Sequence, residues 1–176
     1  MKPQLPIEVD EATGVWSTDG LPMLYVPRHF FVNNHAAIEA ALGVEKYAPL
    51  VYDAGYASAH FWCASESQTH GLAPLATYEH YLKRLSQRGW GRFSFASVDA
   101  ARGAAQIRLE HSAFVLARPG VQGRLCYLFA GWFAGAMDWV LEQSNGAART
   151  SSHESSCAAE GHAHCVFRVS PLAPPA

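Results

Sequence analysis

The sequence predicts a single α+β domain in which helices pack on a small antiparallel sheet. The 176 residues are 49% hydrophobic and 16% charged, which suits one folded domain. Segments with helical spacing of apolar residues fill the first half of the chain, and alternating segments with turn residues dominate the second half. No long linker divides the chain. We therefore expect one domain over residues 1–176, with an N-terminal arm at residues 1–11 and a Pro-rich tail at residues 171–176.

The first half of the chain is predicted to form a strand pair and then three helices. Apolar residues flank Thr18-Asp19-Gly20, which is typical of a tight turn because its glycine can adopt a positive φ. Farther on, Gly43 and Gly89 are typical helix ends. Pro49 falls in the first turn of the second helix, where a missing N–H costs little. The strand pair is expected at residues 12–27 and the helices at residues 27–43, 45–67 and 74–88.

The second half is predicted to form two hairpins with the longest helix between them. Residues 99–103 join the first two strands, and Asn145-Gly146 ends the long helix. The apolar stretch of this helix, residues 125–137, stops at Asp138 and is shorter than the roughly 18 to 20 residues that cross a bilayer. The expected strands are residues 92–98, 104–116, 149–157 and 165–169, and the expected helix is residues 122–142.

Charge and the N-terminal residues exclude several classes of protein. The 13 basic and 15 acidic side chains give a formal charge of -2 without a basic run, so neither nucleic acid nor an anionic membrane is an expected partner. The first ten residues contain Pro3, Pro6 and Glu8 in place of the apolar core of a secretory signal, which predicts a cytoplasmic protein. In a reducing cytoplasm we expect the four cysteines to be free thiols or metal ligands.

Residues 153–165 concentrate the side-chain types that bind metals. This predicted hairpin holds Cys157 and Cys165 together with two carboxylates and three imidazoles, a mixture that suits Zn²⁺. The spacing of the two cysteines is not that of a standard zinc knuckle. Spacing alone therefore leaves two interpretations open, a metal site and a pair of half-buried cysteines beside a solvated turn.

Two further residues are candidates to complete a four-coordinate site, namely Cys126 and Glu154. Cys126 lies near the predicted start of the long helix, where N–H groups favour a thiolate. The alternative is an ordinary buried thiol, because free cysteine often packs as a small hydrophobic residue. That alternative fits best for Cys63, which belongs to the aromatic-rich second helix.

These residues resemble the C-terminal signature of the 4-vinyl reductase (4VR) domain family. The family includes N-terminal sensor domains of phenol- and aromatic-responsive bacterial transcription activators and a protein of bacteriochlorophyll synthesis. Weaker upstream matches extend the resemblance over most of the chain. The matching segments are Cys126-Tyr127-Leu128-Phe129-Ala130-Gly131-Trp132-Phe133-Ala134-Gly135, Glu154-x2-Cys157-x3-Gly161-His162-x2-Cys165, Gly14-x-Trp16, Leu42-Gly43-Val44-Glu45 and Gly55-Tyr56-x-Ser58.

The resemblance implies one structural zinc ion in the C-terminal hairpin. The positions that match the zinc ligands of the sensors are Cys126, Glu154, Cys157 and Cys165. Three thiolates and a carboxylate fill a tetrahedron and leave no position for water, so such a metal is structural rather than catalytic. The interval between Gly135 and Glu154 is longer than in the sensors, which leaves three alternatives to Cys126. They are His153, His162 and His164.

The resemblance also implies an apolar pocket for a small hydrophobic or aromatic ligand. The polar anchors of the family, a histidine on the third helix and an aromatic residue on the second hairpin strand, match His80 and His111, with Leu109 on the same strand face. An imidazole can donate, accept or titrate, so a phenol-sized ligand does not follow automatically. Ordinary core packing is the alternative for each of these residues. The expected pocket walls are Tyr78, Phe93, Phe95 and Trp132.

These features predict a stand-alone sensor or carrier that contains zinc and passes its signal to a partner protein. A homodimer is expected because relatives commonly pair, and Gly131 and Gly135 with Trp132 or Trp139 offer a face for close packing; packing within the chain is the alternative. The rival prediction is an enzyme or tetrapyrrole-handling accessory protein that uses His80 and His111, accessory to bacterial methylated-amine catabolism. Reductase activity has the least support, since no nicotinamide or flavin fingerprint is present.

Overall fold

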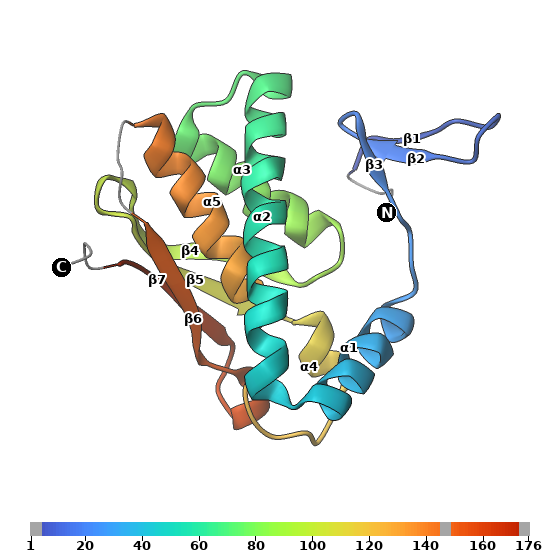
Figure 1. Cartoon of the computed structure of the whole chain (residues 1–176), viewed down its shortest axis with the longest axis vertical. Coiled ribbons are helices and arrows are strands. Elements are labelled where there is room, and N and C mark those ends of the chain that lie inside the picture. The colour runs from blue at the N-terminus through green and yellow to red at the C-terminus, as the bar shows by residue number, and fades with distance from the viewer. Residues whose placement is uncertain (1–4, 145–148, 173–176) are drawn as a thin grey trace.

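Helices cover one face of a four-stranded antiparallel sheet, and a three-stranded sheet lies at the N-terminal end of the chain (Figure 1). The computed structural model describes residues 5–144 and 149–172. Its helices on an antiparallel sheet confirm the predicted α+β class. The predicted helix end at Asn145-Gly146 and most of the predicted tail lie outside the described residues.

The helices predicted at residues 27–43, 45–67 and 74–88 follow the predicted ranges closely, as do the last two strands, whereas the elements predicted at residues 104–116 and 122–142 differ. The helices are α1 (Arg28–Leu42), α2 (Val44–His70), α3 (Pro74–Gln87), α4 (Ala113–Ala117) and α5 (Phe129–Gln143). The strands are β1 (Ile7–Val9), β2 (Trp16–Thr18), β3 (Leu21–Met23), β4 (Arg92–Asp99), β5 (Ala104–Glu110), β6 (Thr150–Ser156) and β7 (Cys165–Pro171).

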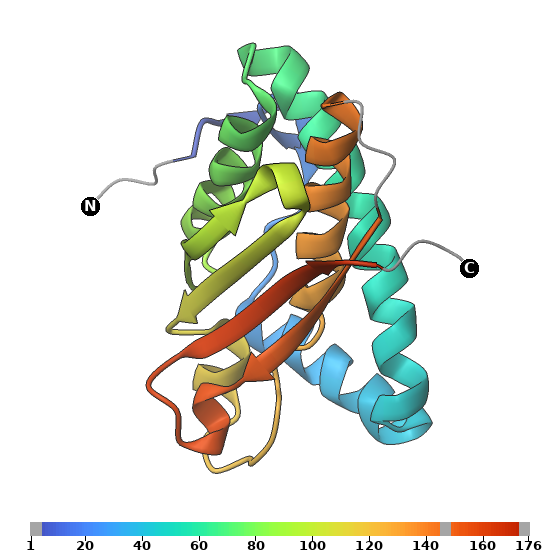
Figure 2. The ribbon, with the colours of Figure 1, turned by 90° about the vertical axis from the view of Figure 1, so that its left-hand side faces the viewer.

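The main sheet joins the two predicted hairpins side by side, in the strand order β4-β5-β7-β6. Strands β5 and β7 are its centre, and their register pairs Leu109 with Cys165. Side chains alternate across the sheet, so Ile107 and Phe167 are buried while Arg108 and Arg168 are exposed. On the buried face, α3 packs on β4 and α5 packs on β6 and β7 (Figure 2). Helix α2 packs on α5 and forms the outer layer.

The predicted strand over residues 104–116 is wrong in its second half, because β5 ends at Glu110. His111 has a left-handed backbone with φ 55, which turns the chain out of the sheet. Ser112 then caps α4, since its side chain accepts a hydrogen bond from the Phe114 N–H. A run of apolar residues at this point therefore belongs to a short helix rather than to a strand.

The predicted helix over residues 122–142 begins later, at Phe129, so α2 with 27 residues is longer than α5. Residues 121–126 are irregular, and Gly123 in this loop has a φ of 109. The backbone N–H of Cys126 is bonded to the Glu154 carboxylate and not to a helical carbonyl. Cys126 consequently lies in the loop that leads into α5, and its backbone is held by a residue of β6.

The small residues of α5 pack against α2 of the same chain. A Cβ added at Gly131 would overlap the backbone of Tyr52, and one added at Gly135 would overlap the backbone of Tyr56. Trp139 is also buried within the chain. The glycine pair therefore packs two helices of the same chain together, which is the second of its two predicted roles. It does not form a face for a second copy of the chain.

Among the described residues, no helix has both the length and the apolar composition that crossing a bilayer requires.

Candidate metal centre and ligand cavity

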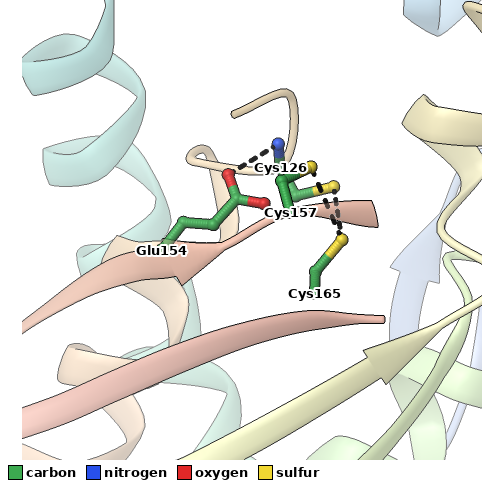
Figure 3. A group of neighbouring side chains, drawn as sticks. All are labelled: Cys126, Glu154, Cys157 and Cys165. Atoms are coloured by element: carbon green, nitrogen blue, oxygen red, sulfur yellow. Dashed lines mark hydrogen bonds between the residues drawn. The ribbon is translucent and has the colours of Figure 1, made fainter. Parts of the chain in front are cut away.

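Cys126, Glu154, Cys157 and Cys165 meet in one buried cluster where the loop before α5 contacts the β6–β7 hairpin (Figure 3). One potential ligand atom from each residue lies within 4.8 Å of the others. The three cysteines are 0% exposed, and Glu154 is 3% exposed. The cluster is thus shielded from water, and it joins Cys126 to hairpin residues that lie 28 to 39 positions later in the chain.

Local backbone features of the hairpin place three of these side chains. The pairing of β6 with β7 shifts register between Glu154 and Ser156, and this irregularity lies just before Cys157. The Cys157 N–H donates to the Glu160 carboxylate at 3.0 Å, which stabilises a 3₁₀ turn at Ala158–Glu160. Gly161, with a φ of 92, ends this turn and lets the chain return so that Cys165 opens β7 opposite Cys157.

The spacing of the sulfur atoms matches a tetrahedral metal site. The Sγ atom of Cys165 lies 3.7 Å from that of Cys126 and 3.6 Å from that of Cys157. Thiolates about 2.3 Å from a tetrahedral zinc ion stand about 3.8 Å apart. All three thiols are free, and a disulfide would need sulfur atoms about 2.05 Å apart. The observed spacing therefore suits a shared metal ion and not a covalent pair.

The fourth ligand and a supporting hydroxyl also fit a metal. Oε1 of Glu154 is buried and has no hydrogen-bond partner among the described residues, while Oε2 accepts from the Cys126 N–H at 3.0 Å. A buried acceptor without a partner is costly unless a cation or donor completes it. The Ser112 hydroxyl lies 3.0 Å from Cys126 Sγ, where it can orient that ligand. These four residues can therefore hold a metal ion.

The ionisable groups of the cluster are buried and strongly coupled to one another. Burial raises the pKa of Glu154 to about 9, and the neighbouring Cys157 adds to the increase. Hydrogen bonds to Cys157 and Cys165 raise the pKa of Cys126, whereas bonds with Cys126 and Cys165 lower the pKa of Cys157. Burial therefore opposes ionisation of Glu154, and hydrogen bonds between the thiols couple the ionisation of the three cysteines. A divalent metal ion would displace protons from these ligands and compensate the charge of the full ligand set.

The other residues considered as zinc ligands lie outside this cluster. His153 and His162 are exposed, and His164 is half-buried. Cys63 is fully buried in the hydrophobic core, as predicted. The cluster contains Cys126 itself, which its position in the loop before α5 brings within reach of the hairpin despite the long interval to Glu154.

Most of the predicted ligand residues lie in a tightly packed aromatic core. Tyr78 is fully buried, and its hydroxyl donates to the Phe133 carbonyl at 2.8 Å. Its ring contacts Phe95 edge to face at 5.0 Å. Phe93 and Leu109 are buried on the sheet face below α3 and α5, and Trp132 is half-buried on α5. These positions have the contacts of core residues, the alternative that the sequence left open.

The two histidines expected in the pocket are not brought together. His80 faces α2, where its Nε2 lies 2.9 Å from Glu66 Oε2 and its ring stacks on Trp62. Burial is the largest cause that lowers the pKa of His80, to about 4. His111 is exposed at the corner after β5. The residues that contact His80, Glu66 above all, were missed because they come from helix positions where the sequence carries no recognisable motif.

A cavity of about 320 Å³ lies between the N-terminal sheet, α1 and the end of α3. Its walls include four aromatic side chains, and its polar lining includes Arg88 and Thr18. None of the seven predicted ligand residues lines it. The aromatic side chains are Trp16, Tyr25, Phe31 and Trp90. The signal that sequence analysis overlooked was the apolar character of residues 15–26, which exceeds what a simple strand pair needs.

The solved structures that are similar to this chain include the following three. The phenol-responsive sensory domain of the transcription activator PoxR, with phenol, has a TM-score of 0.76 at 16% identity over 94% of this chain and 84% of that chain. A trafficking protein particle complex subunit 3 from Naegleria fowleri, covalently bound to palmitic acid, has a TM-score of 0.58 at 14% identity. The match covers 83% of this chain and 95% of that chain. A vinyl-4-reductase family protein from Methanocaldococcus jannaschii has a TM-score of 0.54 at 14% identity. The match covers 86% of this chain and 85% of that chain.

These similarities confirm the expected likeness to sensory domains and to the vinyl-4-reductase fold, and at such identities they establish the fold alone. A family model described as "Domain of unknown function (DUF5943)" matches residues 1–96, which is more than half of the chain. Among the curated proteins, no sequence matches.

Proposed function

We propose that this chain, which belongs to the DUF5943 family, binds a small hydrophobic or aromatic molecule and contains a structural zinc ion, as a stand-alone sensor or carrier. The observation that carries the proposal is the apolar cavity of about 320 Å³ beside the N-terminal sheet. The fold gives independent support, because two similar structures contain phenol and palmitic acid. Cavities of this size, lined by aromatic residues and a few polar groups, are typical small-molecule sites.

The chemistry of the cavity favours a ligand with one hydrogen-bond acceptor or anionic group. Arg88 lines the cavity, and its guanidinium stacks on Trp62 at 5.5 Å. Its Nε and Nη2 atoms are buried and lack a hydrogen-bond partner among the described residues. Burial lowers the pKa of Arg88, which reflects a charge with too little compensation. A small aromatic or aliphatic carboxylate would place its chain or ring against the aromatic walls and its charge beside Arg88.

Titration with benzoate and octanoate tests the ligand proposal, with the fluorescence of Trp16 and Trp90 as the signal. We expect saturable binding that Arg88→Gln weakens about tenfold or more, because a charge-assisted hydrogen bond contributes about 1.5–3 kcal/mol. Arg92→Gln is the matched control, since Arg92 is exposed and pairs with Glu110 away from the cavity. Absence of saturable binding in the wild type, or equal weakening by both variants, contradicts the proposal.

The zinc ion would be held by Cys126, Glu154, Cys157 and Cys165. The sulfur spacing, the buried carboxylate oxygen without a partner and the thiol-rich donor set support this assignment. Such an ion would tie the loop before α5 to both strands of the β6–β7 hairpin. With four protein ligands it supplies structural stability and leaves no coordination position for a substrate.

Metal analysis and thiol titration of the protein as isolated test the zinc site. We expect Cys157→Ser to lose one zinc ion per chain, because a hydroxyl is a poor replacement for a thiolate. Cys63→Ser is the control, since Cys63 is an equally buried thiol outside the cluster. In the wild type, a chelator should make three further thiols reactive. Protein that contains no zinc and has freely reactive thiols in the native state would refute the site.

An enzymatic role based on His80 and His111 gains no support from their positions, since one faces α2 and the other is exposed after β5. We therefore do not propose a catalytic pair. A signalling partner protein and an accessory role in methylated-amine catabolism remain predictions of the resemblance alone.

A further inference from the structure

A second group of metal-binding side chains lies outside the cysteine cluster, where the N-terminal sheet contacts the helices. It consists of Asp19, Glu66, His70 and His80, whose potential ligand atoms lie within 4.8 Å of one another. These residues come from the turn between β2 and β3, the C-terminal part of α2, and α3. Three separate segments of the fold therefore direct two imidazoles and two carboxylates to one point.

Both imidazoles of this second cluster face the same carboxylate. The Nε2 atoms of His80 and His70 lie 2.9 Å and 3.3 Å from Oε2 of Glu66. The His70 Nε2 atom is also 3.5 Å from Oδ1 of Asp19. The convergence of two ring nitrogens on one oxygen is more than a pairwise ion contact requires, and it resembles the placement of ligands around a common centre.

Glu66 provides an independent sign of a missing cation. Its side chain is 0% exposed, and its Oε1 atom has no hydrogen-bond partner among the described residues. A fully buried carboxylate with one oxygen unsatisfied is costly in free energy. A metal ion bound by this oxygen and by the two imidazoles would remove that cost.

The residues around the cluster orient its ligands. Arg84 pairs with Asp19 at 2.7 Å and holds this carboxylate against the helices. The indole of Trp62 stacks on the His80 ring at 5.6 Å. The two carboxylates face the guanidinium of Arg84, and the charge of Arg88 also acts on Glu66. His70 is 33% exposed, which leaves a path for an ion from solvent.

We propose that Asp19, Glu66, His70 and His80 form a second metal site, for a divalent first-row transition metal such as Zn²⁺, Co²⁺ or Fe²⁺. Two imidazoles with carboxylates suit these ions, whereas Mg²⁺ and Ca²⁺ prefer oxygen ligands alone. The bound ion links the β2–β3 turn to α2 and α3. Because β2 and β3 also line the cavity, metal binding stabilises one wall of the proposed ligand site.

Titration of untagged protein with Co²⁺ tests this proposal, because cobalt spectra distinguish ligand types. Cobalt bound by cysteine gives thiolate charge-transfer bands, and cobalt bound by imidazole and carboxylate gives only ligand-field bands. We expect the wild-type protein to bind one equivalent of Co²⁺ at this site, with a spectrum that shows ligand-field bands and no thiolate bands. His70→Ala should weaken binding of this equivalent at least tenfold and leave any thiolate bands unchanged. If the cysteine cluster does not bind metal, only the thiolate bands are absent. The ligand-field bands of the second site are unaffected, so the two proposals are tested separately.

His60→Ala is the matched control. His60 and His70 both lie on α2, their side chains are both 33% exposed, and each contacts a glutamate. The control should bind cobalt as the wild type does. A second measurement covers the case in which His70→Ala fails to fold: in wild-type protein, Zn²⁺ should shift the imidazole NMR signals of His70 and His80 and leave that of His60 in place. Equal binding by both alanine variants, or unchanged His70 and His80 signals, overturns the proposal.

Discussion

His35 is a buried histidine that neither proposed metal site contains, and its neighbours join α1 to the rest of the molecule. Its side chain is 2% exposed, its Nδ1 lies 3.1 Å from the Tyr47 hydroxyl on α2, and its Nε2 lies 3.7 Å from Glu39. The rings of Phe114 and Tyr127 also contact it. Burial lowers the pKa of His35 below its ordinary value of 6.5, despite the opposing effect of Glu39.

This lowered pKa predicts a loss of stability in mild acid. Between pH 6.5 and the lower pKa of the folded state, the unfolded chain binds the proton and the folded chain does not, so the free energy of unfolding falls as pH decreases. The slope for one group is at most about 1.4 kcal/mol per pH unit. Urea unfolding from pH 7.5 to 5.5 should show a shallower pH dependence in His35→Gln than in the wild type. Parallel curves would contradict this prediction, since contributions of the other histidines are common to both proteins.

Helices α2 and α5 approach each other so closely that only glycine fits at two positions of α5. Gly131 and Gly135 are buried against backbone atoms of α2, and the Tyr56 hydroxyl donates to Asp138 of α5 at 2.7 Å. Asp138 in turn accepts from Thr150 of β6 at 2.6 Å. The glycines therefore set the distance between two helices, and the hydrogen-bonded chain then connects both to the sheet.

The direction in which Gly135→Ala changes the free energy of unfolding tests this packing. In a helix, glycine to alanine ordinarily stabilises by about 1 kcal/mol. At residue 135 an added Cβ would overlap the Tyr56 backbone, which cannot rotate away, so we expect Gly135→Ala to destabilise by about 1–3 kcal/mol. The change in the free energy of unfolding in urea measures it. A stabilised variant would show that the helices are farther apart than described.

At the scale of the whole molecule, the N-terminal sheet and α1 expose many apolar side chains. Leu24 is 87% exposed, Tyr25 is 84% exposed and Phe30 is 57% exposed. Large exposed apolar side chains gathered in one region often mark an interaction site. We therefore predict that a homodimer would use this N-terminal region and not the glycines of α5, which pack against α2.

Sedimentation analysis of the purified protein tests the homodimer. We expect a dimer in the wild type, and the double substitution Leu24→Ser, Tyr25→Ser should shift the mass toward the monomer because it removes the most exposed apolar side chains. Phe61→Ser is the control, since Phe61 on α2 is 66% exposed and lies outside the N-terminal region. A wild type that remains monomeric at all concentrations measured would refute the prediction.

The sequence by itself determined the α+β class, the first three helices and the identity of the cysteine cluster. Helical periodicity and end signals such as Gly43 are local properties, so they survive in any tertiary arrangement. The spacing from Glu154 to Cys165 lies within one hairpin, whose strands bring these side chains together. Cys126 was a candidate from its place before the long helix, and the family resemblance then connected it to that hairpin.

Only the tertiary structure decided which polar and aromatic side chains meet across the fold. The periodicity that placed Tyr78 on the buried face of α3 cannot tell a pocket wall from core, because both are apolar. The surroundings of His80 include Glu66 and Asp19, and Asp19 approaches from a turn 61 residues earlier in the chain. Such contacts depend on how separate elements pack, and that packing placed the cavity beside the N-terminal sheet.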